Sequence, residues 1–185
     1  LSLLSIPLKF IYTETATQFC KLSTVHLSYV VEISQNCVAF SEHMKSTKTN
    51  SVNCLTLLQA CVARNPVTNV ATKVMVADNP DSGFNQAALD FNFTSPNPEE
   101  MMKLFNNSPM KYVENVKIPI HLNLGTLDRR VMKTQGMEFF RNLKALGKNV
   151  SVNIYEDNHP LSKVSTHTNI LINAALFFKS ILSQQ

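Results

Sequence analysis

The sequence predicts an α/β fold in which a mostly parallel sheet is flanked by helices. Two strand-like segments, residues 118–124 and 150–155, are each followed by apolar residues at helical spacing. A strand, helix, strand, helix order implies parallel strands joined by right-handed crossovers, with helices packed on the sheet. A chain of 185 residues, 44% of them hydrophobic, is long enough to bury one such core.

The first 59 residues differ in composition from the rest of the chain. They contain none of the four glycines and are rich in Ser and Thr. Residues 25–33 (VHLSYVVEI) have enough β-branched and aromatic side chains for a strand, and the polar residues 41–53 are typical of a loop. We therefore leave residues 1–59 unassigned and place the predicted α/β domain at residues 60–185.

The domain opens with a short apolar run. Residues 60–64 (ACVAR) suit a buried parallel strand, which the Asn65-Pro66 dipeptide ends. Residues 70–77 are ambiguous, and residues 108–116 are predicted to form one short helical turn.

A helix is predicted over residues 95–107 because its start signal is complete. Asn97 is a favourable N-cap, Pro98 takes the first helical position, and Glu99 and Glu100 complement the helix dipole.

Two further helices follow the predicted strands. Residues 132–146 repeat apolar residues at helical spacing, and Gly147 is a natural stop. The last helix is amphipathic, and its predicted apolar face consists of Ile170, Leu171, Ala174, Ala175, Phe178, Ile181 and Leu182.

Composition argues against two function classes. The net charge of +4 is mild and the 17 basic residues are scattered, so nucleic-acid binding has little support. No apolar run reaches the roughly 18 residues of a membrane helix. Residues 1–12 are apolar but lack an initiator Met and a basic leader, which favours an internal segment over a signal peptide. The cysteines match no zinc or redox motif and predict reduced thiols: Cys20, Cys37, Cys54 and Cys61.

Two residues that could perform acid–base chemistry follow the two predicted strands. Asp128 comes after residues 118–124 in a tight turn, and His159 comes after residues 150–155. The carboxyl ends of parallel strands meet at one edge of a sheet, where α/β folds place catalytic groups. Each residue alone has another reading, Asp128 as a cap for the next helix and His159 as an exposed loop residue. Together they favour an acid that orients a histidine base.

The other histidines have no such partner in the pattern, and we interpret them as surface or helix-capping residues: His26, His43, His121 and His167.

Three arginines could contact a substrate carboxylate, because a guanidinium binds carboxylates in a fork. Salt bridges around the sheet edge are the favoured interpretation of Arg64, Arg129 and Arg130.

Three segments resemble one family of serine hydrolases. They are ACVARNPVTN, SPMKYVENVKIPIHLNLGTLDRRV and QGMEFFRNLKALGKNVSVNIYEDNHPLSKV. Together they are similar to the carboxyl-terminal part of the acylaminoacyl-peptidase branch of the prolyl oligopeptidase family, over residues 60–185. The resemblance implies a partial α/β-hydrolase fold, the carboxyl-terminal half of a mostly parallel sheet.

The resemblance also implies a function. Asp128 would be the acid and His159 the base of a Ser-Asp-His triad. Enzymes of this branch release N-acylated amino acids from blocked peptides in the cytoplasm. They use neither a cofactor nor a metal, and they often form oligomers with a β-propeller domain over the active site.

The sequence departs from the family where the nucleophile should be. The Gly-x-Ser-x-Gly elbow should precede ACVARNP by about 20 residues. Counting back reaches Ser41, but the elbow positions hold Ala39 and His43, whose side chains would clash in the strained turn. Nothing before residue 60 resembles an oxyanion-hole loop. Pro160 follows His159, restricts its backbone and lacks an amide donor.

Three hypotheses follow. The first is that the chain is the back half, or a fragment, of an acylaminoacyl-peptidase-type enzyme and is inactive by itself. The second is that it is a non-catalytic hydrolase-like domain that binds a full-length relative. The third is that it is a small esterase that uses Ser41. The strand at residues 60–64 would also present an unpaired, aggregation-prone edge unless residues 25–33 cover it.

Overall fold

The structure, a computed structural model, describes residues 37–41, 58–92 and 94–183. In this part of the chain one sheet has the strand order β1-β2-β3-β4. Strands β2, β3 and β4 are parallel, and β1 is antiparallel to β2. The strands are β1 (Cys37–Ser41), β2 (Leu58–Arg64), β3 (Ile120–Gly125) and β4 (Val150–Tyr155). The predicted α/β fold with a mostly parallel sheet is confirmed.

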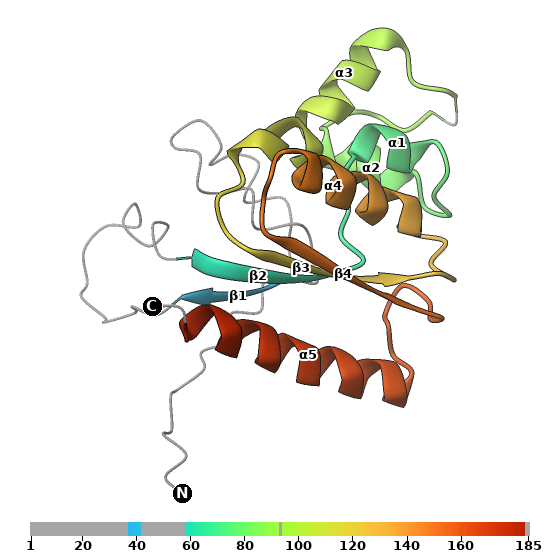
Figure 1. Ribbon diagram of the computed structural model, residues 1–185. Helices are drawn as coiled ribbons and strands as arrows, with labels where there is room; N and C mark the ends of the chain where they lie inside the picture. The colour runs from blue at the N-terminus through green and yellow to red at the C-terminus, as the bar shows by residue number, and fades with distance from the viewer. Residues whose placement is uncertain (1–36, 42–57, 93, 184–185) are drawn as a thin grey trace, which may run out of the picture.

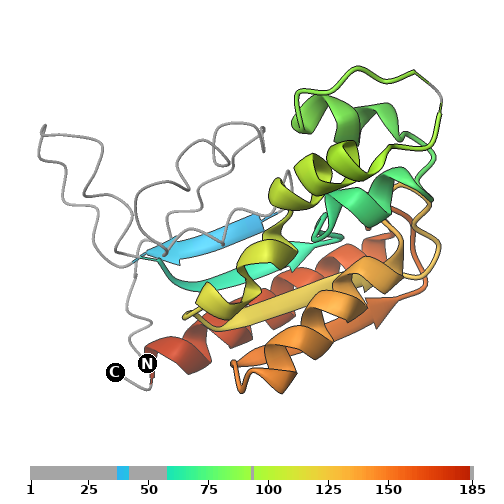
Figure 2. The ribbon, with the colours of Figure 1, turned by 90° about the horizontal axis from the view of Figure 1, so that it is seen from above.

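Helices lie on both sides of the sheet, as Figures 1 and 2 show. The last helix, α5, packs on one face against β2 and β3, and α4 packs on the other face against β3 and β4. The smaller helices lie on the side of α4. The helices are α1 (Val70–Val74), α2 (Asp81–Gln86), α3 (Pro98–Asn106), the 3-10 helix η4 (Pro109–Asn115), α4 (Lys133–Ala145) and α5 (Val164–Leu182).

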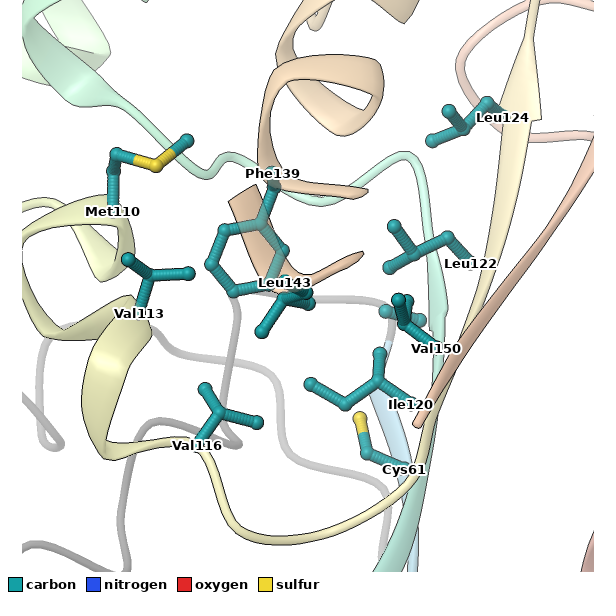
Figure 3. Close-up of a cluster of buried hydrophobic side chains, with 11 residues drawn as sticks. Cys61, Met110, Val113, Val116, Ile120, Leu122, Leu124, Phe139, Leu143 and Val150 are labelled. Atoms are coloured by element: carbon teal, nitrogen blue, oxygen red, sulfur yellow. The ribbon is translucent and has the colours of Figure 1, made fainter. Parts of the chain in front are cut away.

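The main hydrophobic core lies between the sheet and α4 (Figure 3). Phe139 and Leu143 of α4 are fully buried against Ile120 and Leu122 of β3. Helix η4 closes one side of this core with Met110, Val113 and Val116 nearby. Because β3 is buried on both faces, the position of the turn that follows it is well defined.

Smaller clusters complete the packing. Helices α1, α2 and α3 share a second core around Phe84 and Leu104, which also includes Val131 from the turn before α4. On the other face of the sheet, Phe178 of α5 packs on Ala60 and Val62 of β2. The second core therefore connects the three small helices to the segment that carries Asp128.

Several predicted elements are observed with small shifts. Strand β4 has the predicted bounds, β3 starts two residues later than predicted, and α4 lies within the predicted 132–146. Helix α3 begins with the predicted cap: the Asn97 side chain accepts the amide of Glu100, whose carboxylate accepts the amide of Asn97. Residues 70–77, ambiguous in the sequence, contain the short helix α1.

One prediction about the edge of the sheet is not tested by the described residues, and one about α5 needs correction. The free edge of β2 is paired by β1, whereas the predicted strand at residues 25–33 lies outside the described residues. The buried face of α5 includes Ile170 and Phe178, but Leu171 is 56% exposed and was wrongly assigned to it. The half-buried Phe177 turns to the sheet instead. The face that packs repeats at positions 170, 174, 177, 178 and 181, and a helix turns by 100° between neighbouring residues.

Candidate active site

Two loops meet at the carboxyl edge of the sheet. The turn after β3 carries Asp128, and the loop after β4 carries His159. The parallel ladder continues past both strands, because the amide of Thr126 donates to the carbonyl of Tyr155 (2.8 Å) and the amide of Leu127 to that of Asp157 (3.0 Å). The two loops are therefore held side by side by backbone hydrogen bonds.

Asp128 and His159 are in hydrogen-bond contact in this position. The distance from His159 Nδ1 to Asp128 Oδ2 is 2.8 Å, and the Asp128 side chain is fully buried while that of His159 is 21% exposed. The other carboxylate oxygen, Oδ1, accepts the amides of Arg130 and Val131, both at 2.8 Å. One oxygen of Asp128 thus stabilises its own turn, and the second orients the histidine.

This geometry selects one histidine tautomer. A carboxylate accepts hydrogen bonds, so Nδ1 of His159 carries the proton and Nε2 is left as the basic nitrogen. A neutral imidazole in this state can take a proton from a hydroxyl, and the buried carboxylate then stabilises the imidazolium. Pro160, which departs from the family pattern, does not prevent the contact between His159 and Asp128.

Gly125, the last residue of β3, permits the close approach of the histidine loop. A Cβ atom at this position would lie 2.5 Å from the carbonyl oxygen of Asp157 and 2.9 Å from that of Asn158. Both atoms are backbone, so neither could move without displacing the loop. The small residue is therefore needed for the two loops to meet.

Asp157 organises the histidine loop from within and was missed by the sequence analysis. Its carboxylate, in a residue only 1% exposed, accepts the amides of Asn158 (2.8 Å) and Lys163 (2.9 Å). Burial by itself would raise the pKa of Asp157, but these hydrogen bonds, together with Thr166 and the charge of Lys163, hold the pKa below the usual value. A carboxylate seven residues before the start of α5 was the available signal.

The structure does not bring Ser41 to this site. Strand β1 runs antiparallel to β2, and Ser41 pairs with Leu58 at the amino end of β2. Asp128 and His159 lie past the opposite end of the sheet, so the length of β2 alone separates them from Ser41 by about 20 Å. Among residues 58–92 and 94–183, no serine hydroxyl is hydrogen-bonded to His159.

The three arginines have separate roles. Arg130 pairs with Asp78 at 3.6 Å, in line with the expected salt bridge at the sheet edge, and both side chains are about half exposed. Arg64 instead donates to the carbonyls of Pro160 and Leu161. Arg129 is exposed, and the structure gives it no carboxylate partner within the described ranges.

His121 is not the surface residue that the sequence indicated. It lies on β3, 6% exposed, with Nδ1 2.7 Å from the hydroxyl of Ser151 and its ring 5.5 Å from that of Phe177. Burial lowers the pKa of His121. His167 is exposed, and His26 and His43 lie outside the described residues.

The described residues contain neither a cluster of metal ligands nor a helix that could span a membrane. No group of three or more His, Cys, Asp and Glu side chains there is arranged to hold a metal ion. No described helix combines the length and apolarity that crossing a membrane requires.

The fold and the site together define the class of protein. A carboxylate after one parallel strand, in contact with a histidine after the next, is the arrangement of the acid and base in an α/β-hydrolase. The model of the prolyl oligopeptidase family matches residues 55–185. The chain belongs to this family of serine peptidases.

The curated relatives are much longer proteins of a single kind. The chain is 38% identical over 125 residues to acylamino-acid-releasing enzyme of Rattus norvegicus, which is 66% of this chain and 17% of that enzyme. For the Homo sapiens enzyme the identity is 36% over 126 residues, 67% of this chain and 17% of the relative. For the Arabidopsis thaliana enzyme it is 37% over 122 residues, with shares of 64% and 16%. The match thus spans about a sixth of the length of these relatives.

Solved structures are also similar to this chain over a small part of their own length. The uncomplexed acylaminoacyl peptidase of Pyrococcus horikoshii superposes with a TM-score of 0.53 and 25% identity, over 65% of this chain and 19% of that chain. A puromycin hydrolase gives a TM-score of 0.57 at 14% identity, over 70% of this chain and 19% of that chain. At this identity the second likeness shows the shared fold alone.

Proposed function

We propose that this chain supplies the acid and the base of an acylaminoacyl-peptidase-type reaction, the release of an N-acyl amino acid from an N-acylated peptide. The observation that carries the proposal is the 2.8 Å contact between His159 Nδ1 and the buried Asp128 carboxylate. The likeness to acylamino-acid-releasing enzymes supports the substrate class.

The chemistry follows from the tautomer. A serine hydroxyl attacks the carbonyl of the acylated residue while Nε2 of His159 takes its proton, and Asp128 stabilises the imidazolium. His159 then gives the proton to the leaving amine. A water molecule, deprotonated in the same way, hydrolyses the acyl-enzyme.

We further propose that this chain by itself does not perform the reaction. It contains no Gly-x-Ser-x-Gly segment, and Ser41 lies at the wrong end of β2. The proposed functional unit is residues 60–185, the back half of the catalytic domain. From the family resemblance we further propose a cytoplasmic location, no cofactor, and self-association of the intact enzyme.

A chimera tests the acid–base proposal. The matching carboxyl-terminal segment of the human acylamino-acid-releasing enzyme is replaced by residues 58–183, and hydrolysis of acetyl-alanine p-nitroanilide is measured. We expect turnover that falls by about 10⁴-fold in the Asp128→Asn and His159→Ala variants. A folded chimera whose turnover is unaffected by either substitution would refute the roles given to these residues.

The unaltered chain tests the second proposal. We expect neither turnover of acetyl-alanine p-nitroanilide nor labelling by a fluorophosphonate probe. Labelling at Ser41 would overturn the proposed inactivity and support the esterase hypothesis.

One observation favours a binding function as the second candidate. Leu171, Ile172 and Leu176 of α5 are each more than half exposed, and contiguous apolar surface of this kind marks interaction sites. A non-catalytic domain would then bind a full-length relative. Co-elution of the chain with the human enzyme in size-exclusion chromatography tests this candidate, and separate elution would refute it.

A further inference from the structure

The backbone of the histidine loop is bound by two side chains from the end of β2. Four successive carbonyl oxygens, those of residues 158–161, accept these hydrogen bonds. Asn65 Nδ2 donates to Asn158 (3.2 Å) and His159 (2.9 Å). Arg64 Nη2 donates to Pro160 (2.7 Å) and Leu161 (3.1 Å). The chain separation is more than 90 residues in every case, so these bonds are purely tertiary.

The orientation of the Asn65 amide is determined by its surroundings. Its Oδ1 accepts the amide of Gly125 at 2.7 Å, while both protons of Nδ2 are directed to carbonyls. Turning the amide over would place donor against donor and acceptor against acceptor. One buried side chain thereby joins the end of β2, the end of β3 and the loop after β4.

The backbone of Asn65 has an unusual conformation, which accompanies these contacts. Its φ of 42° lies in the left-handed region, and its amide donates to the carbonyl of Asn123 at 2.8 Å. Asn tolerates this region better than most residues. A residue that is 2% exposed and has this backbone conformation is held by its contacts, and those contacts are with the end of β3 and with the histidine loop.

The other contacts of the loop act at other points. Backbone hydrogen bonds from Thr126 and Leu127 join the two loops before residue 158. The Asp157 carboxylate binds amides within the loop and at the start of α5. Among the described residues, Arg64 and Asn65 provide the side-chain hydrogen bonds to the carbonyls of residues 158–161.

We propose that Arg64 and Asn65 are positioning residues that hold the 158–161 backbone against the end of β3, so that Nδ1 of His159 stays within hydrogen-bond distance of Asp128. They act through His159 and need not touch a substrate. Only the expected effect on catalysis rests on the proposed function. The effect on the His159–Asp128 contact does not, because this contact can be observed without turnover.

The test uses a nearly isosteric change in the full chain. Asn65→Asp keeps an acceptor for the Gly125 amide but replaces both donors with an oxygen that repels the two carbonyls. Nitrogen-15 NMR of the ring, at a pH above the usual imidazole range, reports the tautomer. We expect a single Nδ1–H tautomer in the unchanged chain and a mixture of both tautomers in the variant.

Two further variants keep the proposal falsifiable. Arg64→Met retains the apolar stem of a half-buried side chain and removes two of the four bonds, so we expect faster solvent exchange of the Nδ1 proton. Thr68→Val is the control: it removes a buried hydrogen bond to the Gln135 carbonyl without touching the loop. This variant should lose stability and keep the single tautomer.

The outcomes separate this inference from the proposed function. Three outcomes would overturn the positioning role: a folded Asn65→Asp chain with an unchanged ring spectrum, a folded Arg64→Met chain with unchanged exchange of the Nδ1 proton, or a changed spectrum in Thr68→Val. In the human chimera, Asn65→Asp should lower kcat by about 100-fold with little change in KM. An inactive chimera whose NMR response is as expected would refute the function and leave the positioning role intact.

Discussion

Individual residues at the site work through backbone contacts as much as through their side chains. Asp128 uses one oxygen for its own turn and one for His159. Gly125 contributes by lacking a side chain. The site therefore depends on a few positions where the backbone of one loop approaches another within contact distance.

Gly125→Ala should separate the two loops. The added Cβ would overlap the carbonyls of Asp157 and Asn158, so we expect a loss of about 1–3 kcal/mol in unfolding free energy and loss of the single His159 tautomer. Urea unfolding and ring NMR measure these effects. Gly147→Ala is the control, because its φ of 67° costs about 1 kcal/mol with no atom within 4 Å. If Gly125→Ala leaves the tautomer unchanged, the close approach is not needed.

His121 should make stability depend on pH. Its pKa is lowered in the folded state, so the unfolded chain binds more protons below about pH 6.5. The stabilising contribution is complete above that pH and is lost as the pH falls further, by at most about 1.4 kcal/mol per unit. Urea unfolding between about pH 5 and 8 measures it. The His121→Gln variant should show a smaller slope, and an equal slope would contradict the assignment.

At the scale of elements, the loop between β4 and α5 depends on a buried carboxylate. Asp157 accepts the amide of Lys163, the residue that precedes α5, and so caps this helix as well as closing the loop. The same side chain therefore couples the start of a helix to the position of His159.

Asp157→Ala should destabilise both features. We expect a loss of about 2 kcal/mol in unfolding free energy, because two backbone amides lose their charged, buried acceptor. Lys163→Ala serves as the matched control, since it keeps the backbone amide that Asp157 binds. Chemical denaturation compares the two variants, and equal losses would show that the carboxylate is not the cap.

The two faces of α5 should respond differently to substitution. Phe178 is buried on β2, so Phe178→Ala should cost about 3 kcal/mol. Leu176 is 58% exposed, so Leu176→Gln should change stability by no more than about 0.5 kcal/mol and weaken binding to a full-length relative, the second candidate function. Denaturation and sedimentation velocity measure the two quantities. A large loss of stability in Leu176→Gln would mean that this face is covered.

At the scale of the whole molecule, the described sheet carries helices on both faces, and its carboxyl edge brings together the proposed acid and base, Asp128 and His159. Strand β1 covers the edge of β2 in the antiparallel direction. A strand in this direction ends at the amino end of β2, so its last residue, Ser41, lies away from the carboxyl edge that carries Asp128 and His159. Strand direction therefore supports the proposal that Ser41 is not the nucleophile.

Much of the fold could be predicted because its signals are local. The cap of α3 is a property of four consecutive residues, and the bounds of β4 follow from alternation along six. The predicted buried face of α5 was partly wrong. This helix has apolar residues on several sides, and the position of the sheet decides which of them are buried. His121 was misassigned because only the neighbouring Ser151 and Phe177 make its position a buried one.

The sequence by itself determined the order of strands and helices, the family, and the two residues that follow β3 and β4, Asp128 and His159. Strand periodicity and motif spacing are properties of residues close together in the chain. Only the tertiary structure decided that Asp128 and His159 touch, that Ser41 lies at the far end of β2, and that Arg64 and Asn65 hold the histidine loop. These contacts join residues 31 to 97 positions apart. Their geometry depends on strand direction and on backbone approach, which no local pattern contains.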